Sequence, residues 1–139
     1  MRRGVAAAAA CATLLLAAGL AAAATATPDH VRTVTMTIHY SRFDPASLQV
    51  EPGETVRFVV TNTDPIDHEF LVGDAAMQEI HENGTEAHHG ARPGEISVPA
   101  GATVETTFTF PSTLAPGWEF ACHLPSHYDF GMRGPITLG

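Results

Sequence analysis

The stretch Phe120-Ala-Cys-His-Leu-Pro-Ser-His-Tyr-Asp-Phe-Gly-Met132 lies near the C-terminus and is the most informative part of the sequence. It places a thiol at Cys122, an imidazole at His127 and a thioether at Met132, with four residues between each and the next. Soft sulfur with imidazole suits copper, and a trigonal site of two histidines and one cysteine with a long axial methionine is its electron-transfer form. Such a site needs another histidine. His68 is the expected supplier, because it follows a β-patterned run.

Residues 1–26 have the pattern of a secretory signal peptide. A basic pair is followed by an apolar Ala/Leu run over residues 5–24 and by the small-residue cleavage site Ala24-Thr-Ala26. The run is also about long enough to anchor the chain as a membrane helix. Its Ala-rich character and the cleavage site directly after it favour removal of the segment as a signal peptide. We therefore expect a periplasmic or otherwise extracytoplasmic protein with no membrane span in the mature chain.

Removal of the signal peptide leaves Cys122 as the single cysteine, because Cys11 is lost with it. Exported proteins usually pair their cysteines, so an unpaired thiol calls for an explanation. Metal ligation supplies one, since a bound thiolate is no longer free to oxidise or exchange. The alternative is a buried cysteine that acts as a small apolar side chain.

The mature chain, residues 27–139, is acidic and contains no lysine. Loss of the two signal-peptide arginines takes the formal charge from −8 to −10, which argues against nucleic acid or anionic lipid as a partner. About 113 residues remain, enough for one domain with its own core. We expect a monomer, with an acidic surface that could attract a basic redox partner.

Alternating patterns rich in β-branched residues predict short strands separated by Pro/Gly turns, which is typical of a sandwich or barrel. The predicted strands cover residues 31–40, 48–50, 55–61, 68–72, 95–98, 103–110, 117–122 and 134–138.

Residues 74–94 interrupt this pattern. Asp74 could cap a short helix over residues 74–82, and the rest has the composition of a loop. A connection this long in a compact β domain is usually functional or mobile.

Three groups of residues resemble the cupredoxins, the small type 1 copper proteins that include plastocyanin, azurin, rusticyanin and auracyanin. They are Phe43-Asp-Pro-x-x-Leu48-x-Val50-x-x-Gly53-Glu-Thr-Val56-x-Phe58-x-Val60-x-Asn62, then residues 99–110, then Gly117-x-x-Phe120-x-Cys122 with Gly131-Met132. The resemblance covers essentially the whole mature chain. It implies an all-β Greek-key sandwich of seven to eight strands that binds one type 1 copper.

By this resemblance His68, Cys122 and His127 would be the equatorial copper ligands and Met132 the axial one, with a weak backbone carbonyl from Asp67. The edge of His127 would be the electron exit, where a redox partner protein docks. The apolar docking rim would consist of Leu124, Pro125, Phe130 and Met132.

The chain departs from the family pattern at two places. Many members have Asn after the first histidine, where its backbone amide donates to the thiolate. Here the residue is Glu69, which keeps the amide but leaves open whether the side chain tethers the ligand loop. The second departure is the 74–94 insertion, which is similar to that of exported copper-resistance cupredoxins. It offers a possible second copper site at Met77, His81, His88 and His89, and the alternative is a solvated insertion without metal.

Neighbouring residues argue against two related kinds of copper site. A dinuclear electron-transfer site needs a second cysteine where this chain has Ser126, and multicopper oxidases carry histidine on both sides of the cysteine, where this chain has Ala121 and His123. We expect His123 to be a hydrogen-bonding loop residue, and His39 to be structural.

Two functions follow from these features. The first hypothesis is a one-electron carrier that cycles Cu(II) and Cu(I) and is not an enzyme. The alternative is a copper-binding protein of copper resistance or delivery, with a second site in the 74–94 loop.

Overall fold

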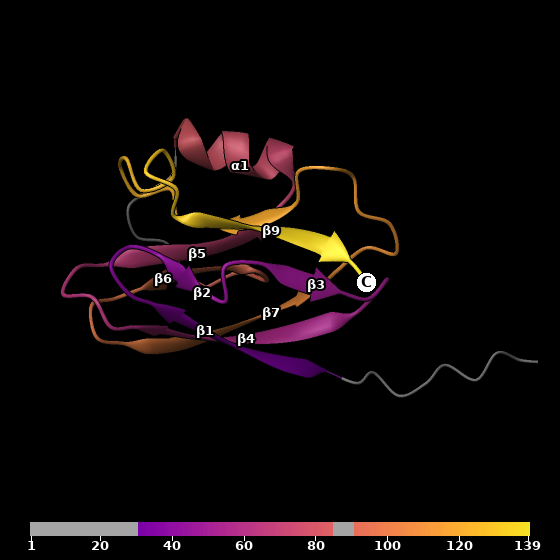
Figure 1. The fold of residues 1–139 in the computed structure, drawn as a ribbon, viewed down its shortest axis with the longest axis horizontal. Coiled ribbons are helices and arrows are strands. Elements are labelled where there is room, and N and C mark those ends of the chain that lie inside the picture. The colour runs from indigo at the N-terminus through magenta and orange to yellow at the C-terminus, as the bar shows by residue number, and fades with distance from the viewer. Residues whose placement is uncertain (1–30, 85–90) are drawn as a thin grey trace, which may run out of the picture.

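Two β-sheets face one another in the computed structural model, which describes residues 31–84 and 91–139 (Figure 1). One sheet has the strand order β2-β1-β4-β7 and the other β3-β9-β8-β5-β6. The strands are β1 (Arg32–Ile38), β2 (Phe43–Asp44), β3 (Leu48–Val50), β4 (Thr55–Asn62), β5 (His68–Gly73), β6 (Glu95–Val98), β7 (Thr103–Thr109), β8 (Glu119–Ala121) and β9 (Arg133–Leu138). The predicted all-β sandwich is confirmed.

The core lies between the sheets and follows from period-two patterning of the strands. In β4 the side chains of Val56, Phe58 and Val60 are fully buried and alternate with more exposed residues. The opposite sheet contributes Phe70 and Phe120, whose rings lie 6.0 Å apart. Burial of these large apolar side chains is the main stabilising contribution to such a fold.

Strand β5 is the exception to this alternation, since all six of its residues are buried. Its inward side chains, Phe70 and Val72, belong to the core. Helix α1 (Ala75–Glu82) lies on the outer face of the five-stranded sheet, on the side away from the other sheet (Figure 1). Gln78 of this helix donates to the carbonyl of Gly73. The helix therefore buries a sheet face that would otherwise meet solvent.

Local signals in the sequence agree with the observed turns and cap. The Asp74 side chain accepts from the Met77 amide and caps α1 as predicted. Gly53 has a φ of +74°, and the Glu54 amide donates to the Glu51 carbonyl over 3.1 Å, so residues 51–54 form one of the Pro/Gly turns expected between strands. The two-residue strand β2 was not predicted, because so short a segment has no measurable period.

Some predictions lie outside the described residues, namely the signal peptide at 1–26 and the histidines His88 and His89. Within 31–84 and 91–139, no helix is long and apolar enough to cross a membrane.

Candidate metal centre

Three of the four predicted ligand side chains meet at one end of the sandwich. His68 opens β5, Cys122 follows β8, and His127 lies in the loop between β8 and β9. The Nδ1 atoms of the two histidines are 3.3 Å apart, and His127 Nδ1 is 3.2 Å from Cys122 Sγ. The three donor atoms all lie within 4.8 Å of one another. One sulfur and two imidazole nitrogens therefore converge as a copper site of this type needs.

Met132, the fourth predicted ligand, is fixed by its backbone to the other loop ligands. Its amide donates to the His127 carbonyl over 2.9 Å, and its carbonyl accepts from the Cys122 amide over 3.1 Å. The side chain is fully buried and belongs to the core cluster. These bonds close the loop from Cys122 to Met132 on itself, so that the ends of the predicted motif lie side by side.

The Cys122 thiol is fully buried and accepts a hydrogen bond from the Glu69 amide over 3.3 Å. That amide contact was predicted and is confirmed. Burial raises the pKa of the thiol to about 11, although the Glu69 and Leu124 amides act in the opposite direction. The copper-free protein therefore holds a protonated thiol at neutral pH, and metal ligation must displace this proton.

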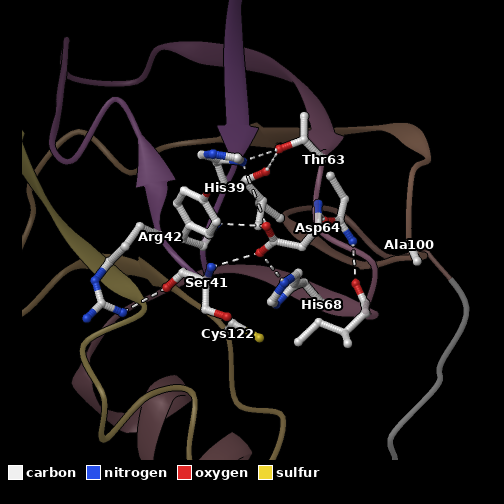
Figure 2. Close-up of polar contacts among 12 residues, drawn as sticks. His39, Ser41, Arg42, Thr63, Asp64, His68, Ala100 and Cys122 are labelled. Atoms are coloured by element: carbon white, nitrogen blue, oxygen red, sulfur yellow. Dashed lines mark hydrogen bonds and ion pairs between the residues drawn. The ribbon is translucent and has the colours of Figure 1, made fainter.

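His68 is oriented by a carboxylate that the sequence analysis did not identify. Its Nε2–H donates to Asp64 Oδ2 over 3.0 Å, which leaves Nδ1 as the lone-pair atom facing Cys122 and His127. Figure 2 shows the Asp64 carboxylate between Ser41 and His68, with Cys122 beside His68. A carboxylate behind a histidine ligand fixes the tautomer and raises the basicity of the ring.

The same carboxylate holds an unusual turn. Asp64 accepts from the amides of Tyr40 and Ser41 over 2.7 and 2.8 Å, and both of these residues have φ near +50°, at 52° and 51°. Burial tends to raise the Asp64 pKa, but hydrogen bonds from the Ser41 and Tyr40 amides and from His68 outweigh it, so the pKa lies below its ordinary value. Asp64 is therefore a carboxylate at neutral pH.

His127 is half-buried, and its pKa is lowered, first by burial and then by the neighbouring His68. The neutral ring that results is the form a metal requires. Around it, Pro125 is exposed, Phe130 is 74% exposed and Leu124 is half-buried.

The prediction that Met132 belongs to an exposed rim is wrong, because this side chain has no exposed surface. It points into the core from a loop whose backbone is bonded back to Cys122 and His127.

His123 is a buried hydrogen-bonding residue, as expected from the sequence. Its Nδ1 lies 2.7 Å from Glu82 Oε2 and its Nε2 lies 2.6 Å from Gln78 Oε1, both on α1. The Gln78 amide nitrogen donates to the Gly73 and Glu119 carbonyls, which fixes its oxygen towards His123. Each ring nitrogen of His123 therefore faces a side-chain oxygen of α1, and the helix holds the ring through both.

The Glu69 side chain tethers the ligand loop, which answers a question that the sequence left open. Its Oε2 accepts from the backbone amide of His123 over 3.0 Å. One residue thus holds the loop twice, through its amide on Cys122 and through its carboxylate on His123.

The two possible second copper ligands on α1 differ in their burial. Met77 is 40% exposed, whereas His81 is 6% exposed and lies with Glu69 and Glu95 in a second group of close donor atoms. The contributions of His88 and His89 stay predictions, since both lie outside the described residues.

Two other predicted residues have ordinary contacts. His39 follows β1 and its Nδ1 lies 2.9 Å from Thr63 Oγ1, a structural role. The Asp67 side chain accepts from the Ala100 amide over 2.9 Å, and its backbone contribution to the metal stays a prediction.

Comparisons with known proteins identify relatives along nearly all of the described chain. The sequence profile of copper binding proteins, plastocyanin/azurin family, matches residues 30–139. The copper-resistant cuproprotein CopI of Rubrivivax gelatinosus is 42% identical over 100 residues, which are 70% of this chain and 59% of that protein. CopI of Pseudomonas aeruginosa is 31% identical over 139 residues, with 77% of this chain and 76% of that protein covered. The chain thus spans less than two thirds of the Rubrivivax relative.

Solved structures with the same fold include two auracyanins. Auracyanin of Roseiflexus castenholzii has a TM-score of 0.61 at 23% identity, with 77% of this chain and 96% of that chain covered. Auracyanin A of Chloroflexus aurantiacus has the same TM-score and identity, 0.61 and 23%, with 79% of this chain and 100% of that chain covered. At this level of identity the likeness concerns the fold alone.

The thiol environment predicts how copper-free protein reacts with a thiol-alkylating reagent. Because the pKa of Cys122 is about 11, the reactive thiolate is scarce near neutrality and its fraction rises as the pH approaches that value. We expect slow alkylation of the folded protein at about pH 8, and faster reaction as the pH rises. The same protein unfolded in denaturant is the control, since its thiol ionises near pH 8.5. Equal rates for the folded and unfolded protein at about pH 8 would contradict this account.

Proposed function

The chain belongs to the plastocyanin/azurin family of copper-binding proteins, and from that premise we propose that it is an exported cuproprotein of copper resistance that holds copper in a type 1 site. The observation that carries this is the convergence of Cys122 Sγ with the Nδ1 atoms of His68 and His127. It is a binding and redox protein rather than an enzyme.

The donor chemistry fits copper. His68, Cys122 and His127 would hold the metal, with the Met132 thioether as a further, weaker donor. One thiolate and two imidazoles suit both oxidation states, and the buried amide contact to sulfur favours the thiolate once the thiol proton has left. Copper bound there would supply one-electron chemistry by cycling between Cu(II) and Cu(I).

The residues around the ligands would restrict their movement during this cycle. Asp64 holds the His68 ring from behind, and Glu69 holds the loop at Cys122 and His123. A site that changes little between oxidation states exchanges electrons readily, because little reorganisation accompanies the transfer. The same rigidity would keep the metal from leaving, which serves retention of copper.

Copper resistance takes precedence over a dedicated electron carrier for two reasons. The CopI relatives are named for copper resistance, and two side chains of α1, Gln78 and Glu82, bond to His123 in the ligand loop. An insertion bonded to the metal loop is readily explained in a protein that captures and holds copper, whereas a simple carrier does not need it. This reverses the order of preference that the ligand motif alone suggested.

A dedicated electron carrier is the second candidate, and the surroundings of His127 favour it. The ring is half-buried, with Pro125 and Phe130 exposed nearby in the same loop. A partner protein could dock on this apolar edge and exchange electrons through His127. The acidic charge of the chain would favour a basic partner. Export, with residues 1–26 as the signal peptide and 27–139 as the copper-binding domain, is part of both proposals.

The proposed function predicts a paired result in solution and in cells. The purified protein should bind one copper with an intense thiolate-to-copper absorption, and the Cys122→Ser variant should lose this band because the sulfur donor is gone. In a bacterial host made copper-sensitive by deletion of its own gene for this protein, the wild-type chain should restore growth in the presence of copper. The Cys122→Ser variant should not.

Ser126→Ala is the matched control for this experiment, since it changes an exposed hydroxyl in the same loop. Absence of the band in copper-loaded wild-type protein would refute the type 1 site. If the thiolate-to-copper absorption is present but deletion of the gene does not change copper tolerance, the result would instead support the electron carrier.

The Asp64 carboxylate predicts a shift in reduction potential. Its negative charge at the His68 Nε2–H stabilises Cu(II) more than Cu(I), so Asp64→Asn should raise the potential of the copper-loaded protein. We expect about 60 mV or more, the one-electron equivalent of a tenfold change in preference. Redox titration of the absorption band measures it. Asp67→Asn is the control, because that carboxylate is exposed and accepts from the amide of Ala100 in a loop, and an equal shift in both variants would contradict a specific role for Asp64.

A further inference from the structure

A second group of donor side chains lies on the outer face of the five-stranded sheet. Glu69 of β5, His81 of α1 and Glu95 of β6 each contribute one atom to a cluster whose atoms all lie within 4.8 Å of one another. The residues are 3%, 6% and 7% exposed. Glu69 pairs with Ser97 and Leu71 with Glu95 in the antiparallel register of β5 and β6. The two glutamates are therefore diagonal neighbours on one face, and α1 lays His81 over them.

The charges of this cluster favour a bound cation. Two carboxylates buried this close repel each other, and burial makes each one expensive unless it is compensated. His81 Nε2 lies 3.4 Å from Glu95 Oε1, which places a nitrogen donor beside the carboxylates. Arg92 approaches the same oxygen at 3.6 Å, but its side chain is 67% exposed and therefore strongly screened. A divalent cation among the three side chains would neutralise both carboxylates.

The orientation of His81 supports metal ligation. Its Nδ1–H donates to the Met77 carbonyl over 3.0 Å, one turn back on α1. In the neutral ring this bond leaves the Nε2 lone pair directed at the carboxylates. Histidine ligands of metals usually donate their other ring N–H to a carbonyl or carboxylate in this manner, which fixes tautomer and ring direction.

An ion could reach the cluster from solvent. An open pocket of about 410 Å³ is lined by His81, Glu82 and Asn83 from α1 and its end, and by His123, Leu124 and Pro125 from the ligand loop. His81 thus borders both the pocket and the buried cluster. A plausible metal site requires such an entry path in addition to its ligands.

We propose that Glu69, His81 and Glu95 form a second metal site, separate from the type 1 centre, which binds Cu(II). The donors are one imidazole and two carboxylates without sulfur, a set that suits divalent borderline ions and disfavours Cu(I). Among first-row divalent ions, Cu(II) binds such N/O sites most tightly. The site differs from the ligand set predicted on α1, because it uses carboxylates from β5 and β6 in place of the exposed Met77.

Glu69 connects the two sites. Its amide donates to Cys122 Sγ, and its carboxylate accepts from the His123 amide while also facing His81 and Glu95. A cation held by this carboxylate therefore lies directly behind the loop that carries the type 1 ligands. The protein would hold one copper in a redox site and a second, as Cu(II), in the layer under α1.

The experiment uses the full chain with Cys122→Ser and His127→Gln, which removes the thiolate and one of the two converging imidazoles and makes the result independent of the proposed function. Equilibrium dialysis against Cu(II) measures stoichiometry and affinity, and pulsed electron paramagnetic resonance counts the coordinated imidazoles. We expect one Cu(II) per chain with a single imidazole. In this background, His81→Gln and Glu95→Gln should each weaken binding at least about tenfold, since loss of even an outer partner has that effect.

Two controls separate this site from other copper binding. Glu79→Gln changes an exposed carboxylate on the same helix and should leave affinity unchanged. Replacement of His88 and His89 by alanine tests the loop histidines. Retention of Cu(II) in His81→Gln or Glu95→Gln, coordination by two imidazoles, or no bound Cu(II) at all would each overturn the proposal. Introduced with Cys122 and His127 intact, each substitution should preserve the type 1 absorption, which shows that the variant folds.

Discussion

The contacts of Glu69 with the ligand loop hold the candidate copper centre together. The residue follows His68 in β5, so its backbone position fixes the first histidine. Its amide bonds to Cys122 Sγ over 3.3 Å and its carboxylate to the His123 amide over 3.0 Å, so the same residue also fixes the loop that carries the cysteine. Strand and loop come from distant parts of the chain, and these two bonds continue the pairing of β5 with β8, at Leu71 and Ala121, as far as the ligands. The buried strand β5 in turn depends on α1 to cover its outer face.

The helix thus has a role in the site as well as in the fold. Gln78 and Glu82 bond to the ring of His123, next in sequence to the buried cysteine. The insertion therefore stabilises the ligand loop through His123, and Asp64 separately fixes the ring of His68. Carboxylates thus hold two parts of the candidate site, Asp64 the ring of His68 and Glu82 the ring of His123. Such support suits the proposed retention of copper. The half-buried His127 leaves one edge through which electrons could pass.

How much of this could be predicted from the sequence depended on distance along the chain. Cys122, His127 and Met132 lie within one loop, so their spacing alone made them candidate ligands. The strand patterning predicted the sandwich, and Asp74 before a helical segment predicted the cap of α1. Asp64 looked like an ordinary turn residue, because its partners Tyr40, Ser41 and His68 come together only in the folded chain. Glu69 and Glu95 likewise became neighbours only through the register of β5 and β6. The burial of Met132 was missed because loop backbone bonds, which have no sequence signature, turn it inward.

The central claim is that one thiolate and two imidazoles from this chain bind copper together. X-ray absorption at the copper edge, on protein loaded with one equivalent of copper, tests it most directly. The account predicts one short copper–sulfur distance with two nitrogen donors, and loss of the sulfur contribution in Cys122→Ser. A copper shell of nitrogen and oxygen alone in the wild-type protein would contradict it.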